Sequence, residues 1–160
     1  MSHSVYSDEP WFHPTSLVYL SSLLKPDWVI FETGCGSSTL YFSNRAKRVV
    51  SFEQTKGWYN ILKEIIKDKE IENIDLRFDP DYPEKGIWGF REDEFDFVSL
   101  DGRGRAKSIE TLLPYLKPGG YLLLDNSERA RYEKAIALLN KWKNRVFGDY
   151  KWQTTIWEKP

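Results

Sequence analysis

The chain has 160 residues, with 23 Lys and Arg against 24 Asp and Glu, so its formal net charge is −1. This balance excludes the strongly basic charge with which many proteins attract nucleic acid or anionic membranes, and the single cysteine excludes an internal disulfide framework. No apolar run approaches the roughly 20 residues that cross a bilayer, and the first ten residues lack an apolar signal core. We therefore expect one cytoplasmic domain over residues 1–160.

In chain order, short apolar strands alternate with amphipathic helical patterns. A helix begins at Pro14, directly after His13. A second helical stripe begins at Trp58 and continues through Ile61, Leu62 and Ile65, which we expect to lie in the core. In this half, strands are predicted at Trp28–Phe31, Val49–Phe52 and Ile74–Phe78, each bounded by polar or turn residues.

The second half continues the alternation. One helical stripe runs from Ile109 to Leu116, and Pro114 should break or tighten its last turn. A longer helix is predicted from about Ser127, with an apolar face that ends at Trp142. Strands are predicted at Phe95–Leu100, Tyr121–Leu124, Arg145–Phe147 and Trp152–Trp157. This order of strands and helices predicts an α/β sandwich of three layers with a mostly parallel sheet.

The loop after the first strand carries the most informative motif. Glu32-Thr-Gly34-Cys-Gly36-Ser-Ser-Thr39 runs from a strand into a glycine turn that opens a helix, and glycines there let the backbone turn tightly and approach a ligand. The second strand ends at Glu53, 19 residues after Gly34. An acid about 20 residues after such a turn accepts ribose hydroxyls in nucleotide-binding βαβ units, so the sequence predicts a nucleoside cofactor.

Two residues of this turn favour S-adenosylmethionine over a dinucleotide. The carboxylate of Glu32 would repel a pyrophosphate at the helix N-terminus, and Thr39 stands where the dinucleotide fingerprint has Gly or Ala. S-adenosylmethionine instead carries a sulfonium and an ammonium group, which an acid attracts. An NAD-dependent oxidoreductase remains the less favoured alternative.

These motifs resemble those of the class I S-adenosylmethionine-dependent methyltransferases, over nearly the whole chain. The four similar segments, in order, are Glu32–Ser38, Val49–Glu53, Phe95–Gly102 and Leu116–Asn126. The resemblance implies a Rossmann-like, seven-stranded sheet whose last strand, Trp152–Trp157, is antiparallel.

The resemblance also implies the roles of the cofactor-binding residues. Glu32 and the backbone from Gly34 to Ser37 would hold the methionine moiety, Glu53 would bind the ribose, and Gln54 and Asp79 would lie near the adenine. The predicted cofactor site is completed by Cys35, Gly36, Ser38 and Asp101.

The chemistry needs an aligned acceptor and, where a proton must leave, a base. The candidate bases are Asp101 and Asp125, which follow the fourth and fifth strands. With Asn126 these acids are similar to the metal site of catechol-type O-methyltransferases. That family places a lysine where this chain has Gly104, so a divalent metal is left as an open alternative.

The acceptor is expected to be small or exposed and to be methylated at oxygen, because Leu100-Asp101-Gly102-Arg103 lacks the Asn/Asp-Pro-Pro-aromatic run of many nitrogen-methylating enzymes. Arg103 and Arg129 suggest an anionic acceptor, since guanidinium groups bind carboxylate or phosphate. Alternatively the arginines of these loops pair with Asp101, Asp125 and Glu128 and only hold the loops. Asn126 and Trp11 complete the predicted substrate site.

Several aromatic residues fall outside the predicted strands and helices. They lie in the segment Tyr6–Phe12 and in the connection Pro80–Glu92, and are Trp11, Phe12, Tyr82, Trp88 and Phe90. We interpret them as pocket wall or partner surface rather than core, with a second copy of the chain as a candidate partner. A subunit that binds the cofactor without catalysis is the alternative from another class.

Overall fold

The computed structural model describes residues 9–160, so Tyr6 of the predicted pocket segment lies outside the described residues. The strands are β1 (Val29–Thr33), β2 (Arg48–Glu53), β3 (Ile74–Phe78), β4 (Phe95–Leu100), β5 (Leu116–Asp125), β6 (Lys143–Asp149) and β7 (Trp152–Glu158). The helices are α1 (Pro14–Leu23), α2 (Ser37–Ser43), α3 (Lys56–Asp68), α4 (Arg105–Leu112) and α5 (Glu133–Ile136).

The seven strands form one sheet in the order β3-β2-β1-β4-β5-β7-β6. Strands β1 to β5 pair in parallel, and β7 lies antiparallel between β5 and β6. The predicted fold class is thereby confirmed. The chain leaves β1 toward β2 on one side and returns through β4 on the other, which places a topological switch point at the carboxyl ends of β1 and β4, where ligands bind in such sheets.

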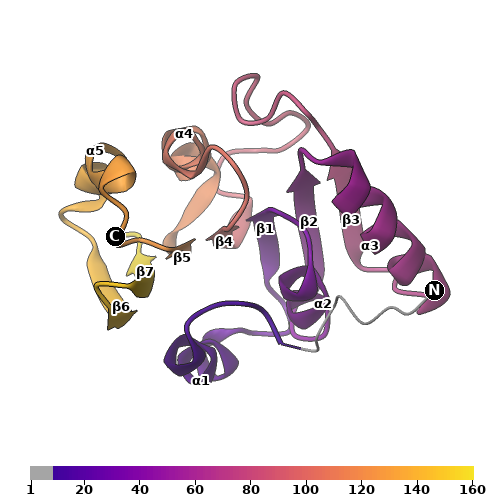
Figure 1. The fold of residues 1–160 in the computed structure, drawn as a ribbon, viewed down its shortest axis with the longest axis horizontal. Coiled ribbons are helices and arrows are strands. Elements are labelled where there is room, and N and C mark those ends of the chain that lie inside the picture. The colour runs from indigo at the N-terminus through magenta and orange to yellow at the C-terminus, as the bar shows by residue number, and fades with distance from the viewer. Residues whose placement is uncertain (1–8) are drawn as a thin grey trace.

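Helices cover both faces of the sheet, with α4 and α5 on one face and α1 and α2 on the other (Figure 1). Each face has its own apolar cluster, one around Phe31, Leu100 and Leu124, the other around Ile30, Phe97 and Leu123. Among residues 9–160, no helix has the length and apolar character needed to cross a membrane.

The helix predicted from Ser127 is wrong in its start and its length. Only Glu133–Ile136 is α-helical, and 3₁₀ turns flank it at Ala130–Tyr132 and Ala137–Leu139. Ser127 instead pairs with β7: its N–H donates to the Gln153 carbonyl at 3.0 Å, and its hydroxyl lies 2.6 Å from that of Thr155. This tertiary pairing prevents an earlier helix start.

Leu116 is also misplaced by the helical pattern, because it is the first residue of β5. Pro114 lies in a 3₁₀ turn, Leu113–Tyr115, as the predicted tightening of that helix requires. In α3, Leu62 and Ile65 are buried as predicted, but Trp58 and Ile61 are each 44% exposed, so these two are not core residues.

The interpretation of the aromatic residues is wrong for three of the five. Phe12 and Tyr82 are buried, and Phe90 packs against the core cluster that contains Tyr82. The connection between β3 and β4 covers the sheet in place of a helix, so its rings fill that layer. Only Trp11 and Trp88 are largely exposed.

We predict that Phe12→Ala lowers the free energy of unfolding by about 3 to 5 kcal/mol, because it leaves a cavity among buried side chains. Its neighbour Trp11, 73% exposed, serves as the matched control, and Trp11→Ala should change stability by no more than about 0.5 kcal/mol. Urea denaturation of both variants measures this. Equal losses in the two would contradict the assignment of Phe12 to the core and Trp11 to the surface.

Candidate functional site

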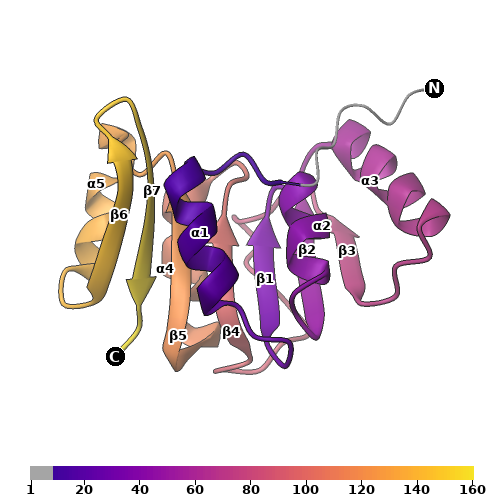
Figure 2. The same ribbon diagram turned by 90° about the horizontal axis from the view of Figure 1, so that it is seen from below.

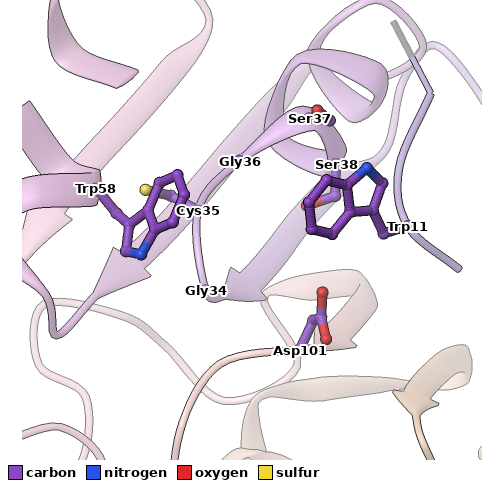
Figure 3. A pocket seen from close by; sticks show the side chains of 8 residues that line it. All are labelled: Trp11, Gly34, Cys35, Gly36, Ser37, Ser38, Trp58 and Asp101. Carbon is purple, nitrogen blue, oxygen red and sulfur yellow. The ribbon is translucent and has the colours of Figure 1, made fainter. Parts of the chain in front are cut away.

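Two adjoining cavities open at the carboxyl edge of the sheet, with volumes of about 150 Å³ and about 600 Å³. Both are lined by Gly34, Cys35, Trp58 and Asp101. The smaller cavity adds Trp11, Gly36, Ser37 and Ser38 (Figure 3). The larger one adds Glu53, Gln54, Thr55, Gly102, Arg103, Gly104, Arg105, Ala106, Arg131 and Tyr132. The predicted glycine turn, ribose acid and fourth-strand acid are therefore neighbours.

Glu32 is buried beneath this turn and lines neither cavity. Its carboxyl group accepts hydrogen bonds from the hydroxyls of Ser38, Thr39 and Ser51, the last at 2.8 Å. Burial raises the pKa of Glu32 to about 7, against the lowering effect of these hydroxyls. The geometry thus gives Glu32 partners within the protein, whereas the resemblance implied a direct contact with the cofactor.

Thr39 has a role that the sequence did not reveal. Its hydroxyl accepts the N–H of Gly36 at 3.0 Å and donates to Glu32. The residue is fully buried. A threonine at this position therefore fixes the start of α2 to the end of β1, where the dinucleotide fingerprint has only a small residue. The two hydrogen bonds of the Thr39 hydroxyl reveal this role, and they form only once the glycine turn has folded.

The glycine turn touches the loop after β4 through backbone atoms. Gly34 has φ +83°, and a Cβ on it would lie 2.7 Å from Cα and N of Gly102. A Cβ on Gly102 would in turn lie 2.8 Å from N of Gly34. Side chains are excluded from both positions, so the two loops form one continuous floor.

Glu53 lines the larger cavity and is also held by backbone groups. One carboxylate oxygen accepts the N–H of Cys35 at 2.9 Å, and the other accepts the N–H of Thr55 at 2.7 Å. Gln54 donates its amide protons to the carbonyls of Tyr82 and Arg103. Burial raises the pKa of the Cys35 thiol well above its usual range, which opposes thiolate chemistry there.

Asp101 is the only one of the two predicted bases that lines the cavities. Its carboxylate pairs with Arg105 at 2.7 Å. Burial raises the pKa of Asp101 to about 7, Arg105 opposes this, and the negative charge of Asp125 adds to it. A carboxyl group with this pKa changes protonation near neutral pH, as a general base requires.

Asp125 is buried and lines neither cavity. Its side chain accepts hydrogen bonds from Thr154 Oγ1 at 2.6 Å and from Trp152 Nε1 at 3.2 Å. Burial raises its pKa, which the bond from Thr154 counteracts. Asp125 therefore connects β5 to β7, and its carboxylate lies away from the space that a ligand would fill.

The residues similar to a metal site do not fit a divalent cation. The guanidinium group of Arg105 lies among them, 2.7 Å from the Asp101 carboxylate, 3.2 Å from Asn126 Oδ1 and 2.5 Å from the Asp125 carbonyl. Within the described part of the chain, no three His, Cys, Asp or Glu side chains form a metal-binding group. A second cation among these groups would be repelled by the guanidinium.

The remaining arginines divide into two groups. Arg105 pairs with Asp101, and Arg129 lies 3.8 Å from Glu128 and lines neither cavity. These two arginines therefore contact acids of their own loops, as the alternative interpretation expects. Arg103 and Arg131 line the larger cavity and form no ion pair with any residue from 9 to 160.

Asp79, predicted near the adenine, accepts the N–H of Asp81 and lines neither cavity.

Comparison with known proteins identifies the fold. No family model and no curated protein matches the chain. The tRNA (m1A58) methyltransferase TrmI from Aquifex aeolicus matches with TM-score 0.72 and 16% identity, over 96% of this chain and 71% of that one. A SAM-dependent O-methyltransferase from Thermotoga maritima matches with TM-score 0.72 and 12% identity, over 91% of this chain and 65% of that one. M. jannaschii TYW2 in complex with AdoMet matches with TM-score 0.67 and 14% identity, over 94% of this chain and 76% of that one.

The raised pKa of Glu32 predicts a pH-dependent stability. Between its ordinary value of 4.5 and about 7, the folded protein keeps a proton that the unfolded chain releases, so rising pH favours unfolding. The loss should reach at most about 3 kcal/mol and level off above pH 7.

Denaturation of wild type and Glu32→Gln across pH 4 to 8 isolates the effect of this group. The wild type should lose more stability than Glu32→Gln as the pH rises, while Glu64→Gln on the exposed side of α3 keeps the wild-type slope. Parallel curves for wild type and Glu32→Gln would show that the pKa of Glu32 is the same in the folded and the unfolded protein, and would contradict the raised value.

Proposed function

We propose that this chain, which has the fold of the class I S-adenosylmethionine-dependent methyltransferases, binds S-adenosylmethionine at the carboxyl edge of its sheet and transfers the methyl group to a small or exposed acceptor. The observation that carries this proposal is the Glu53 carboxylate, which lines the larger cavity beside Gly34. Gly34 follows β1 at the topological switch point, where sheets of this kind bind nucleosides, and Glu53 ends the neighbouring strand β2.

The residues present fit the cofactor. Each Glu53 oxygen accepts one backbone N–H, so acceptor capacity for ribose hydroxyls remains, since a carboxylate offers about four lone-pair sites. A volume of about 600 Å³ lies within the range of roughly 300 to 1,000 Å³ that small-molecule sites occupy. When bound, S-adenosylmethionine supplies an activated methyl group, so the protein must align the acceptor and remove a proton where necessary.

Oxygen is the proposed acceptor atom. Asp101 lies at the junction of the two cavities, and its pKa of about 7 suits the acceptance of a proton from a hydroxyl group. The fold does not select the atom, because the similar structures include a tRNA (m1A58) methyltransferase and an O-methyltransferase. The support therefore comes from Asp101 and from the absence of a Pro-Pro-aromatic run after β4.

An anionic group on the acceptor is part of the proposal. Arg103 and Arg131 line the larger cavity and would present guanidinium donors to a carboxylate or phosphate. Arg131 replaces Arg129 in this role, because the Arg129 side chain lies beside Glu128 and lines neither cavity. Replacing both Arg103 and Arg131 is thus the relevant change for acceptor binding.

Calorimetric titration with S-adenosylhomocysteine tests the cofactor. Wild type should bind it, and Glu53→Gln should bind about ten- to a hundredfold more weakly, because a charge-assisted hydrogen bond is worth about 1.5 to 3 kcal/mol. Glu64→Gln, a matched change on the exposed side of α3, should leave the affinity unchanged. Tighter binding of NADH than of S-adenosylhomocysteine would overturn the proposal in favour of an oxidoreductase.

A second test concerns Asp101 as the base. If hydroxylated acids are offered as acceptors, kcat/KM should rise with pH up to about 7 and then level off, because the carboxylate is the active form and its pKa lies there. Asp101→Asn should lower kcat by about a hundredfold or more and remove this pH dependence. Cofactor binding without turnover of any acceptor would favour the non-catalytic subunit, and an unchanged profile in Asp101→Asn would exclude Asp101 as the base.

A further inference from the structure

The segment before α1 crosses the carboxyl edge of the sheet from α1 toward α2 (Figure 2). Within it, Phe12 is 1% exposed and packs against Phe42 of α2, while Trp11 is 73% exposed. The Trp11 indole lies beside Ser38 and faces the space that contains Asp101, with Trp58 on the other side of the glycine turn (Figure 3). Trp11 is therefore a wall of the smaller cavity carried by an N-terminal segment.

Two consecutive hydrogen bonds, one partly buried and one buried, attach this segment to the end of β5. The backbone N–H of His13 donates to Thr154 Oγ1 at 2.9 Å, and the Thr154 hydroxyl donates its own proton to Asp125 Oδ1 at 2.6 Å. Thr154 is fully buried and Asp125 is 4% exposed. Because the Thr154 hydroxyl proton points to Asp125, the lone pairs of the hydroxyl are free to accept the His13 N–H. Asp125 therefore determines which way the Thr154 hydroxyl is oriented in this pair of hydrogen bonds.

The hairpin of β6 and β7 also contacts the side chain of His13. The rings of His13 and Trp152 meet edge to face with centroids 5.3 Å apart, and Trp152 Nε1 also donates to Asp125 at 3.2 Å. Gly148 leaves room for the imidazole, since a Cβ there would lie 2.8 Å from His13 Cδ2. Two strands distant from the glycine turn thus fix the residue two positions after Trp11.

We infer that Asp125 is a positioning residue: through Thr154 and the His13 backbone it holds Trp11 in place as a wall of the methyl-transfer pocket. The assignment as a pocket for methyl transfer rests on the proposed function, whereas the anchoring of residues 9–13 does not. Asp125 is separated from the reacting groups, because its carboxylate lines neither cavity and one of its oxygens already accepts two hydrogen bonds.

Two pairs of variants of the full chain isolate the anchor. Thr154→Val removes the hydroxyl, and Thr154→Ser keeps it. His13→Pro removes the backbone N–H at a residue whose φ of −54° proline adopts without strain, and His13→Ala keeps the N–H while removing the ring. Thermal melting and circular dichroism establish which variants fold. If Thr154→Val does not fold, the comparison of His13→Pro with His13→Ala tests the anchor without it.

The first readout is deuterium uptake at residues 9–13, which requires no ligand. Thr154→Val and His13→Pro should exchange about tenfold faster there, since the loss of the hydrogen bond from the His13 N–H to Thr154 frees the segment, while Thr154→Ser and His13→Ala stay within about threefold of wild type. Unchanged uptake in both Thr154→Val and His13→Pro would overturn the anchoring.

The second readout is S-adenosylhomocysteine affinity. Thr154→Val, His13→Pro and Trp11→Ala should each weaken the affinity for S-adenosylhomocysteine about tenfold at an unchanged fold. Thr154→Ser, which keeps the hydroxyl, should keep the wild-type affinity. If Asp125→Asn abolishes methyl transfer while Thr154→Val leaves both affinity and rate at wild-type values, Asp125 acts directly and the inference is wrong. If wild type binds no S-adenosylhomocysteine, the proposed function fails, and deuterium uptake still decides the anchor.

Discussion

A buried carboxyl group at the end of β1 organises the loop on which the site is built. Glu32 accepts hydrogen bonds from two hydroxyls of α2 and one of β2, so the strand, the helix that follows it and the neighbouring strand meet at one group. Charge burial is costly unless such partners are present. The backbone of the glycine turn is left free to line the cavities because the side chain of Glu32 points beneath it.

On the other side of the switch point, Arg105 joins the loops that follow β4 and β5. Its guanidinium contacts Asp101, Asn126 and the Asp125 carbonyl, and it is the group on which the residues similar to a metal site converge. The two loop acids consequently have different surroundings. Asp101 faces the cavities, whereas the Asp125 carboxylate accepts hydrogen bonds from Trp152 and Thr154 of β7.

Local pattern was enough to predict the sheet, because buried parallel strands are continuous apolar runs between turn residues. It also located the glycine turn, Glu53 and Asp101 at one edge. It could not predict that Glu32 points toward Ser51, since that contact depends on the register of β1 against β2, nor that Ser127 pairs with β7 instead of starting a helix. Burial favours the neutral form of Glu32, so its side chain repels a pyrophosphate less than an exposed carboxylate would.

The contact between Gly34 and Gly102 also restricts how sequences with this site can vary. Each position excludes a Cβ because the backbone of the other lies against it, so a side chain gained at one glycine cannot be accommodated by a change of side chain at the other. The two positions should stay glycine together in any relative that keeps this spacing of loops. Such a joint requirement links distant parts of the chain, and it offers a criterion for recognising relatives whose overall identity is low.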